Sequence, residues 1–264
     1  MRTWRTCIVI ATMLAGWVVL ATVPSAPSAR ASSMSGASAQ STTGTGVTAT
    51  VPAGESPVGV GVDEHTDTVY VTNEFRDTVS VISGRTNAVV ATVPVGTQPI
   101  NVAVNQATDR IYVASQAGGT VSVISGRTNT VVATVASGHG TSGVAVDPVT
   151  NMIYATNTGD GTVSVIDGRT NTVTATVGVG RSPFGIAVDE RAGAVYVTNI
   201  SDDTVSVLSG RTNMVVATIP VGSEPRGVGV NTRTGTAYVS NFASNTLTVL
   251  CVRKPAGAHL GTLG

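Results

Sequence analysis

Hydrophobic and polar residues alternate along most of this chain, in short runs that are separated by turn residues. Four such runs follow one another between residues 58 and 95, each rich in β-branched residues and each bounded by Gly, Asn, Asp or Ser: 58–62, 68–72, 78–82 and 88–95. Alternation with a period of two, bounded by turn chemistry, indicates short β-strands. The apolar period of 3.6 residues that an amphipathic helix needs is absent. The pattern therefore predicts a unit of four strands.

This unit repeats with a constant spacing of 42 residues. Every tyrosine of the chain falls on that spacing: Tyr70, Tyr112, Tyr154, Tyr196 and Tyr238. Gly-Arg-Thr-Asn turns recur with the same spacing and begin at Gly84, Gly126, Gly168 and Gly210. Four short strands in a repeat of this length are typical of one blade of a β-propeller. The sequence therefore predicts an all-β chain, a five-bladed β-propeller of 42-residue four-stranded repeats.

The ends of the repeat region predict how the ring closes. Pro52, Pro94 and Pro220 occupy equivalent positions in the fourth strand of the unit, which indicates an outer edge strand because proline cannot donate a ladder hydrogen bond. Residues 47–54 (VTATVPAG) match residues 89–96 (VVATVPVG), so the repeat region begins with a fourth strand and ends with a third. We expect the N-terminal strand to complete the last blade and close the propeller.

The regions outside the repeats have a different composition. Residues 1–31 resemble a signal peptide, with two early arginines, an uncharged apolar run and a small-residue cleavage pattern at 29–31; an uncleaved membrane anchor is the alternative. Residues 32–46 are rich in Ser, Thr and Gly and predict a flexible linker. The propeller is expected over 47–252 and a C-terminal tail over 253–264. We therefore expect a secreted or cell-surface protein with no membrane span after signal cleavage.

The charge and cysteine content narrow the classes of partner. Lys and Arg number 15, as do Asp and Glu, and the loss of three arginines with the signal leaves the mature chain mildly acidic. Nucleic-acid binding is therefore disfavoured. Cys251 is the one cysteine outside the signal, which excludes an intramolecular disulfide in the mature chain. We expect a monomer without a cofactor.

The tetrapeptides that contain the tyrosines resemble the signature of a known repeat family. Tyr-Val-Thr-Asn begins at Tyr70 and Tyr196, and close variants begin at Tyr154 and Tyr238, whereas Tyr112 begins Tyr-Val-Ala-Ser. These phrases, with NTVVATVPVG-like segments, resemble the YVTN β-propeller repeat family over about residues 47–251. The resemblance implies an extracytoplasmic binding or structural role, as in surface-layer and exported propeller proteins, and supplies no catalytic motif.

Residues that recur in every repeat are interpreted as scaffold. We expect the tyrosines to be packing aromatics. The ring of Asp63, Asp147 and Asp189, with the equivalent Asn105 and Asn231, is expected to cap turns and not to bind a metal. The recurrent arginines are expected to be solvated turn residues, because acids share their face: Arg85, Arg127, Arg169, Arg211 and Arg253.

Residues that break the repeat gather in the loops of the opposite face. Aromatic and arginine residues on loops of a rigid scaffold are typical of a recognition surface. The predicted binding residues are Phe75, Arg76, Arg181, Phe184, Glu224, Arg226 and Phe242. The alternative reading is that Phe184 merely plugs the mouth of the channel.

The expected function is non-enzymatic binding of a protein or carbohydrate of the cell envelope. Nucleophile-elbow, zinc-protease, Cys-x-x-Cys and phosphate-loop motifs are absent from the sequence. Two alternatives remain open. One is a metal-dependent lactonase or lyase centred on Glu55, His139 and Glu224, and the other is a purely architectural surface-layer component.

Overall fold

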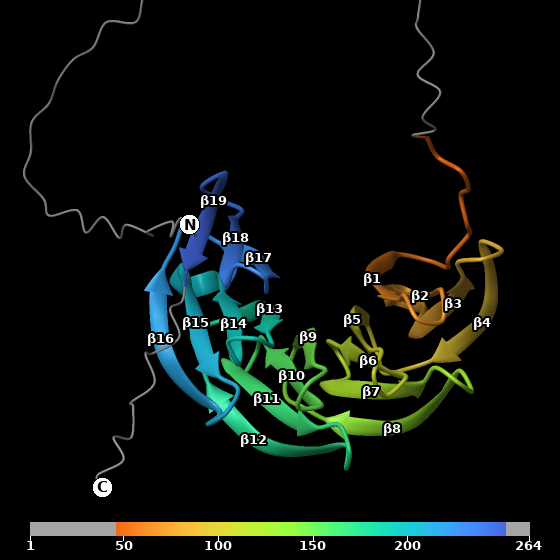
Figure 1. The fold of residues 1–264 in the computed structure, drawn as a ribbon, viewed down its shortest axis with the longest axis horizontal. Coiled ribbons are helices and arrows are strands. Elements are labelled where there is room, and N and C mark those ends of the chain that lie inside the picture. The colour runs from red at the N-terminus through yellow and green to blue at the C-terminus, as the bar shows by residue number, and fades with distance from the viewer. Residues whose placement is uncertain (1–45, 252–264) are drawn as a thin grey trace, which may run out of the picture. The chain divides into compact units, whose positions relative to one another are not determined.

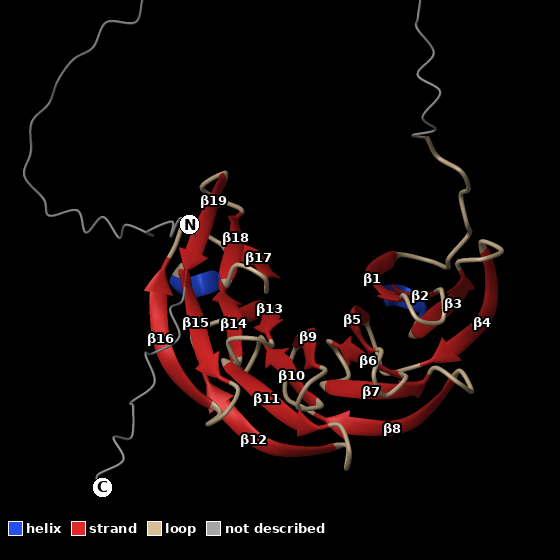
Figure 2. Ribbon diagram, in the orientation of Figure 1, coloured by secondary structure: helices blue, strands red, loops and turns tan. Residues whose placement is uncertain are grey.

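The computed structural model describes residues 46–251, which are all-β apart from two short 3-10 turns (Figures 1 and 2). The chain divides into two compact units, residues 1–48 and 49–264, and the strands all belong to the second. The predicted signal peptide, most of the linker and the tail, including Arg253, lie outside the described residues. Among the described residues no helix is long and apolar enough to cross a membrane.

The described residues form 19 strands in five antiparallel sheets. The first sheet holds β1 (Pro57–Asp63), β2 (Thr68–Asn73), β3 (Thr78–Ser83) and β4 (Ala88–Pro94). The second holds β5 (Pro99–Asn105), β6 (Arg110–Ser115), β7 (Thr120–Ser125) and β8 (Thr130–Ala136). The third holds β9 (Thr141–Asp147), β10 (Met152–Asn157), β11 (Thr162–Asp167) and β12 (Thr172–Gly178).

The fourth sheet holds β13 (Pro183–Asp189), β14 (Ala194–Asn199), β15 (Thr204–Ser209) and β16 (Met214–Pro220). The fifth holds β17 (Pro225–Asn231), β18 (Thr236–Asn241) and β19 (Thr246–Cys251). The 3-10 turns η1 (Glu74–Arg76) and η2 (Ile200–Asp202) connect the second and third strands of the first and fourth sheets. In every sheet the strands are hydrogen-bonded in chain order. The repeat of four-stranded antiparallel sheets is thus confirmed, and it is consistent with a β-propeller-like fold.

Consecutive sheets pack face to face, with the first strand of each on the inner side of a curved row and the fourth strand outside (Figure 1). The outer position of the proline-containing fourth strands, β4 and β16, is as predicted. The tyrosines form the centre of this packing. Tyr70 shares a core cluster with Val102 and Ile111 of the second sheet, and Tyr196 with Val239 of the fifth.

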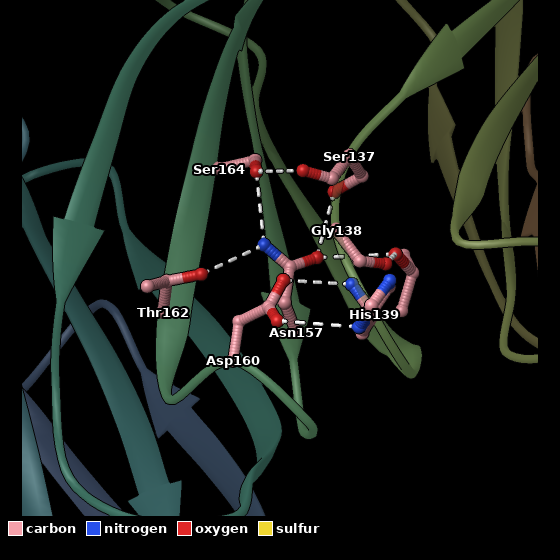
Figure 3. A network of polar contacts seen from close by, with 8 residues as sticks. Ser137, Gly138, His139, Asn157, Asp160, Thr162 and Ser164 are labelled. Carbon is pink, nitrogen blue, oxygen red and sulfur yellow. Dashed lines mark hydrogen bonds and ion pairs between the residues drawn. The ribbon is translucent and has the colours of Figure 1, made fainter.

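The asparagine of each Tyr-Val-Thr-Asn phrase ties its strand to the next one. Figure 3 shows the third sheet, where the Asn157 amide donates to the hydroxyls of Thr162 and Ser164, each at 3.0 Å. Its carbonyl oxygen accepts from Ser137 at 2.8 Å. The same pair of amide donations recurs at Asn73, Asn199 and Asn241. The asparagines are therefore scaffold residues, because their side chains satisfy buried polar atoms of their own sheet.

The predicted closure of the ring is absent from the structure. The fifth sheet has three strands, and β19 pairs with β18 alone. Residues 47–54 carry no strand. The Ala53 carbonyl instead accepts a hydrogen bond from Ser80 of β3, which fixes this end of the segment at the first sheet. The closed five-bladed ring is thus not confirmed, because the two sheets that would have to meet lie at opposite ends of the row (Figure 1).

Candidate functional site

Five equivalent residues at the start of the inner strands line a hollow of about 280 Å³ on the inner side of the sheets. Each sheet contributes one of them: Val58, Ile100, Ser142, Phe184 and Arg226. The spacing of 42 residues relates all five, yet no two are the same residue. The residues directly before and after these positions are nearly the same in every repeat, whereas these five residues all differ. We name these five residues the axial row.

The residues that follow the axial row are small, and the packing requires it. Four of the five are glycine, and the second sheet has Asn101. A Cβ atom on Gly185 would overlap the carbonyl oxygen of Arg226, and one on Gly143 would overlap that of Phe184. The glycines therefore let neighbouring inner strands approach closely and hold the backbone of the axial row.

The threonine of the Tyr-Val-Thr-Asn phrase fixes the same backbone from the other side. The Thr198 hydroxyl accepts from the Gly185 amide at 2.8 Å and donates to the Arg226 carbonyl of the next sheet at 3.0 Å. Thr156 bridges Gly143 and Phe184 in the same way, and Thr72 bridges Gly59 and Ile100. The second sheet has Ala114 at this position and lacks the bridge. The threonines are thus junction residues that position the axial row.

Arg226 has the most elaborate surroundings in the axial row. Its guanidinium carbon lies 4.0 Å from the centroid of the Phe242 ring, a cation–π contact. Its Nη2 donates to Glu224 Oε2 at 3.1 Å. Both charged side chains are about half exposed, so they remain within reach of a ligand. The structure therefore brings together four of the predicted site residues: Phe184 and Arg226 in the axial row, and Glu224 and Phe242 beside it.

The other predicted charges are tied to partners in their own sheets. Arg76 Nε lies 2.5 Å from Glu55 Oε2, and Arg181 Nε lies 2.5 Å from Asp202 Oδ1. Repeat spacing makes these the same pair of positions, with the charges exchanged. Arg181, Asp202 and their counterparts therefore link two loops of one sheet, which explains their variation without a ligand.

Two further sheets fill this pair of positions with other complementary residues. The His139 amide donates to Asp160 Oδ2 at 2.8 Å in the third sheet (Figure 3), and the Ser223 amide donates to Ser244 Oγ at 3.1 Å in the fifth. Because surface pairs of this kind contribute little stability, their sign can exchange between sheets freely. Phe75 follows Glu74 in η1, is largely exposed and does not line the axial hollow.

The three residues of the alternative metal site are held apart by these pairings. Glu55 contacts Arg76, His139 contacts Asp160, and Glu224 contacts Arg226, each within a different sheet. Over residues 46–251 no group of three potential metal-ligating side chains is found. The geometry therefore gives the lactonase or lyase hypothesis no support.

The residues interpreted as scaffold behave as such. Asp63 accepts from the His65 amide at 2.9 Å, and the equivalent Asp and Asn residues cap their turns likewise. Burial raises the pKa of Tyr70 to about 12, with smaller effects from nearby carboxylates. Burial raises the pKa of Tyr154 to about 12 as well. Arg85, Arg127, Arg169 and Arg211 are exposed turn residues, and Asp167 pairs with Arg169.

Comparisons with known proteins support the fold alone. No family model matches the chain, and no curated protein matches it. Among solved structures, a functionally unknown protein from Desulfotomaculum acetoxidans DSM 771 aligns at 16% identity with a TM-score of 0.62, covering 75% of this chain and 69% of that one. Kuenenia stuttgartiensis hydrazine synthase aligns at 16% identity with a TM-score of 0.50, covering 75% of this chain and 84% of that one. At this identity the likeness shows a β-propeller-like repeat fold.

Three members of the axial row were not among the predicted site residues: Val58, Ile100 and Ser142. Their residue types are ordinary for a strand, so none stands out when the chain is read in sequence. An alignment of the five repeats would have found them. Their position holds Val, Ile, Ser, Phe and Arg, and a near-invariant glycine follows it.

Proposed function

We propose that this chain is a secreted or cell-surface protein of the YVTN repeat kind, a non-enzymatic scaffold that binds a protein or carbohydrate of the cell envelope over the axial row. The export signal and the tetrapeptide phrases support the location and the family resemblance. The fold supplies a rigid frame on which single positions vary without cost to the packing.

One observation carries the proposal: five equivalent residues, each different from the other four, line one hollow. A repeat protein has no packing reason to place Val, Ile, Ser, Phe and Arg at equivalent positions with the same backbone contacts. Variation along an inward-facing row is what a binding surface requires, since each sheet then presents a different group to one ligand.

The chemistry of the row indicates the kind of group that it would bind. Val58, Ile100 and Phe184 offer apolar contact, Ser142 and Asn101 offer hydrogen bonds, and Arg226 offers one cation. Phe242 holds that cation in place, and Glu224 partly neutralises it. The row suits a partner with a small apolar surface beside a carboxylate or hydroxyl group.

Retention on isolated cell envelopes tests the proposal. Phe184→Ala and Arg226→Ala should each lower the binding constant at least about tenfold, because central aromatic and arginine contacts dominate most interfaces. Arg211→Ala, an equally exposed arginine on a turn between third and fourth strands, is the matched control and should bind as the unchanged protein does. Phe75→Ala should also leave binding intact. Equal retention by all four variants would remove the axial row as the binding surface.

An architectural role in a surface layer is a second candidate. It is favoured by a separate observation, the exposed apolar residues of the first and fifth sheets, whose equivalents are buried in the other sheets.

A further inference from the structure

The first and fifth sheets each expose apolar residues whose equivalents the interior sheets bury. On the fifth sheet Tyr238, Leu247 and Val249 are 40%, 61% and 56% exposed, whereas the equivalent Tyr196, Val205 and Val207 of the fourth sheet are fully buried. Contiguous exposed apolar residues of this kind mark an interaction surface.

The first sheet exposes part of the opposite half of this interface, at its inner strand β1, whereas Val71 and Ile82 on the same face are 6% and 8% exposed. Val60 is 63% exposed, whereas its equivalent Val102 in the second sheet is 7% exposed and packs in the cluster of Tyr70. A hollow of about 490 Å³ lies on this sheet between residues 52–55 and β3 and β4. Four junctions between consecutive sheets already join a tyrosine face to a valine face. The exposed residues of the two sheets are therefore of the kinds that meet at those four junctions.

The fifth sheet has three strands, and a segment elsewhere in the chain has the sequence of a fourth. Among the described residues no fourth strand pairs with β19, and an edge of this kind readily accepts an added strand. Residues 47–54 have the sequence of a fourth strand, carry no strand in the structure, and are exposed at six of their eight positions. We name residues 47–54 the donor segment.

The donor segment and the acceptor edge belong to opposite ends of one row of sheets. To bring them together within one chain, the four junctions would have to change their angles. The threonine bridges and the glycine contacts fix three of those junctions at hydrogen-bond distance, so each change would break buried polar contacts. Pairing between two chains leaves every junction as it is.

We propose that the chain self-associates head to tail, with the donor segment of one copy adding as the fourth strand to β19 of a second copy. Backbone hydrogen bonds between the donor segment and β19 hold the two copies together. Burial of the exposed apolar residues of the first and fifth sheets adds to the free energy of association. This differs from the monomer expected from the sequence and goes beyond the proposed binding function.

The repeats predict the register of the added strand. In the complete sheets Ser83 lies opposite Ala88, and Ser125 lies opposite Thr130. Cys251 occupies the position of Ser83, and Gly46 occupies that of Ala88. Gly46 of one copy should therefore lie opposite Cys251 of the other, at a Cα separation that a disulfide can span.

Disulfide trapping tests the proposal directly. In a full chain that carries Cys7→Ser, Gly46→Cys should give covalent dimers and larger species under mild oxidation, seen on a non-reducing gel. Thr50→Cys is the matched control, because it is equally exposed but lies four residues out of register, and it should give at least about fivefold less dimer. Trapping of Gly46→Cys within one chain, as a cross-linked monomer, or the absence of any trapping would overturn the proposal.

A measurement of mass without cysteine chemistry gives an independent test. Val51 is equivalent to the buried Val93, whereas Thr50 is equivalent to the exposed Thr92. Val51→Asp should therefore convert the protein to a monomer by light scattering, and Thr50→Asp should not. Neither residue lies in a strand of the structure, so both variants keep the five sheets. A monomeric unchanged protein at high micromolar concentration would reject self-association.

Discussion

Tyr196 and Tyr238 are the same residue in the same register of consecutive sheets, yet one is fully buried and the other is 40% exposed. Tyr196 lies opposite Val207 in its own sheet and packs against the fifth sheet, and Tyr238 lies opposite Val249 with no sixth sheet to pack against. The sequence of a repeat therefore determines what its face can bury. What the face does bury depends on whether a neighbour follows.

The largest expected effect comes from replacing Tyr196 and, in a separate variant, Tyr238 with alanine. Tyr196→Ala should lower the free energy of unfolding by about 3–5 kcal/mol, because it leaves a cavity in a close-packed junction. Tyr238→Ala should cost less than about 1 kcal/mol in a monomeric sample, since little packing is lost. Urea unfolding of both variants measures the difference. Equal losses would mean that Tyr238 is covered in solution, which would itself locate a partner on that face.

Alkaline pH should separate buried from exposed tyrosines next. Because burial raises the pKa of Tyr70 and Tyr154 from 10.0 to about 12, the unfolded chain loses these protons before the folded one does. Their contribution to stability is fully present below pH 10 and is lost as the pH rises toward 12, at about 1.4 kcal/mol per pH unit for each tyrosine.

Unfolding midpoints between pH 9 and 11.5 check this prediction. Tyr70→Phe and Tyr154→Phe should flatten the pH dependence, whereas Tyr238→Phe serves as the control. A slope that neither Phe variant changes would assign the alkaline loss to other groups.

The threonine bridges should show a smaller effect. Thr198→Val removes a hydroxyl that links Gly185 and Arg226 across a junction, and should cost about 1–2 kcal/mol because two backbone groups lose a partner. Ser240 occupies the same position in the fifth sheet, where it contacts Gly227 alone. Ser240→Ala should therefore cost less than half as much. Thermal denaturation compares the two, and equal costs would show that the hydroxyl acts within its own sheet.

The smallest effect is expected at the loop pairs. Asp202→Asn removes the ion pair with Arg181 but keeps a side chain that can accept from its amide. The melting temperature should stay within experimental error, because exposed ion pairs contribute little. A marked loss would mean that η2 depends on this pair for its conformation.

The repeated part of the molecule could be predicted well from the sequence, and the ends could not. The strands, the turns and the outer position of Pro94 follow from local residue patterns that recur at every repeat. The closure over 47–54 depended on the angle between sheets, and no single residue encodes an angle. The angle between two sheets arises from contacts such as that between Gly185 and Arg226, which lie 41 residues apart in the chain.

The candidate site likewise contains some residues that the sequence predicted and others that it did not. Phe184, Arg226 and Phe242 were predicted from the sequence because they break the repeat, and the two phenylalanines also stand out in a chain that is poor in aromatic residues. Arg76 and Arg181 were conspicuous for the same reason, but each has an acidic partner two strands away that a linear reading does not place beside it. Val58 and Ile100 required the comparison of repeats.

The order of strands within each sheet has a consequence for how the molecule is made. Every sheet consists of strands that are consecutive in the chain, so none has to wait for residues that are synthesised much later. Pairings this local form quickly. A growing chain can therefore complete one sheet after another from its N-terminal end, with each finished sheet serving as the template on which its successor condenses.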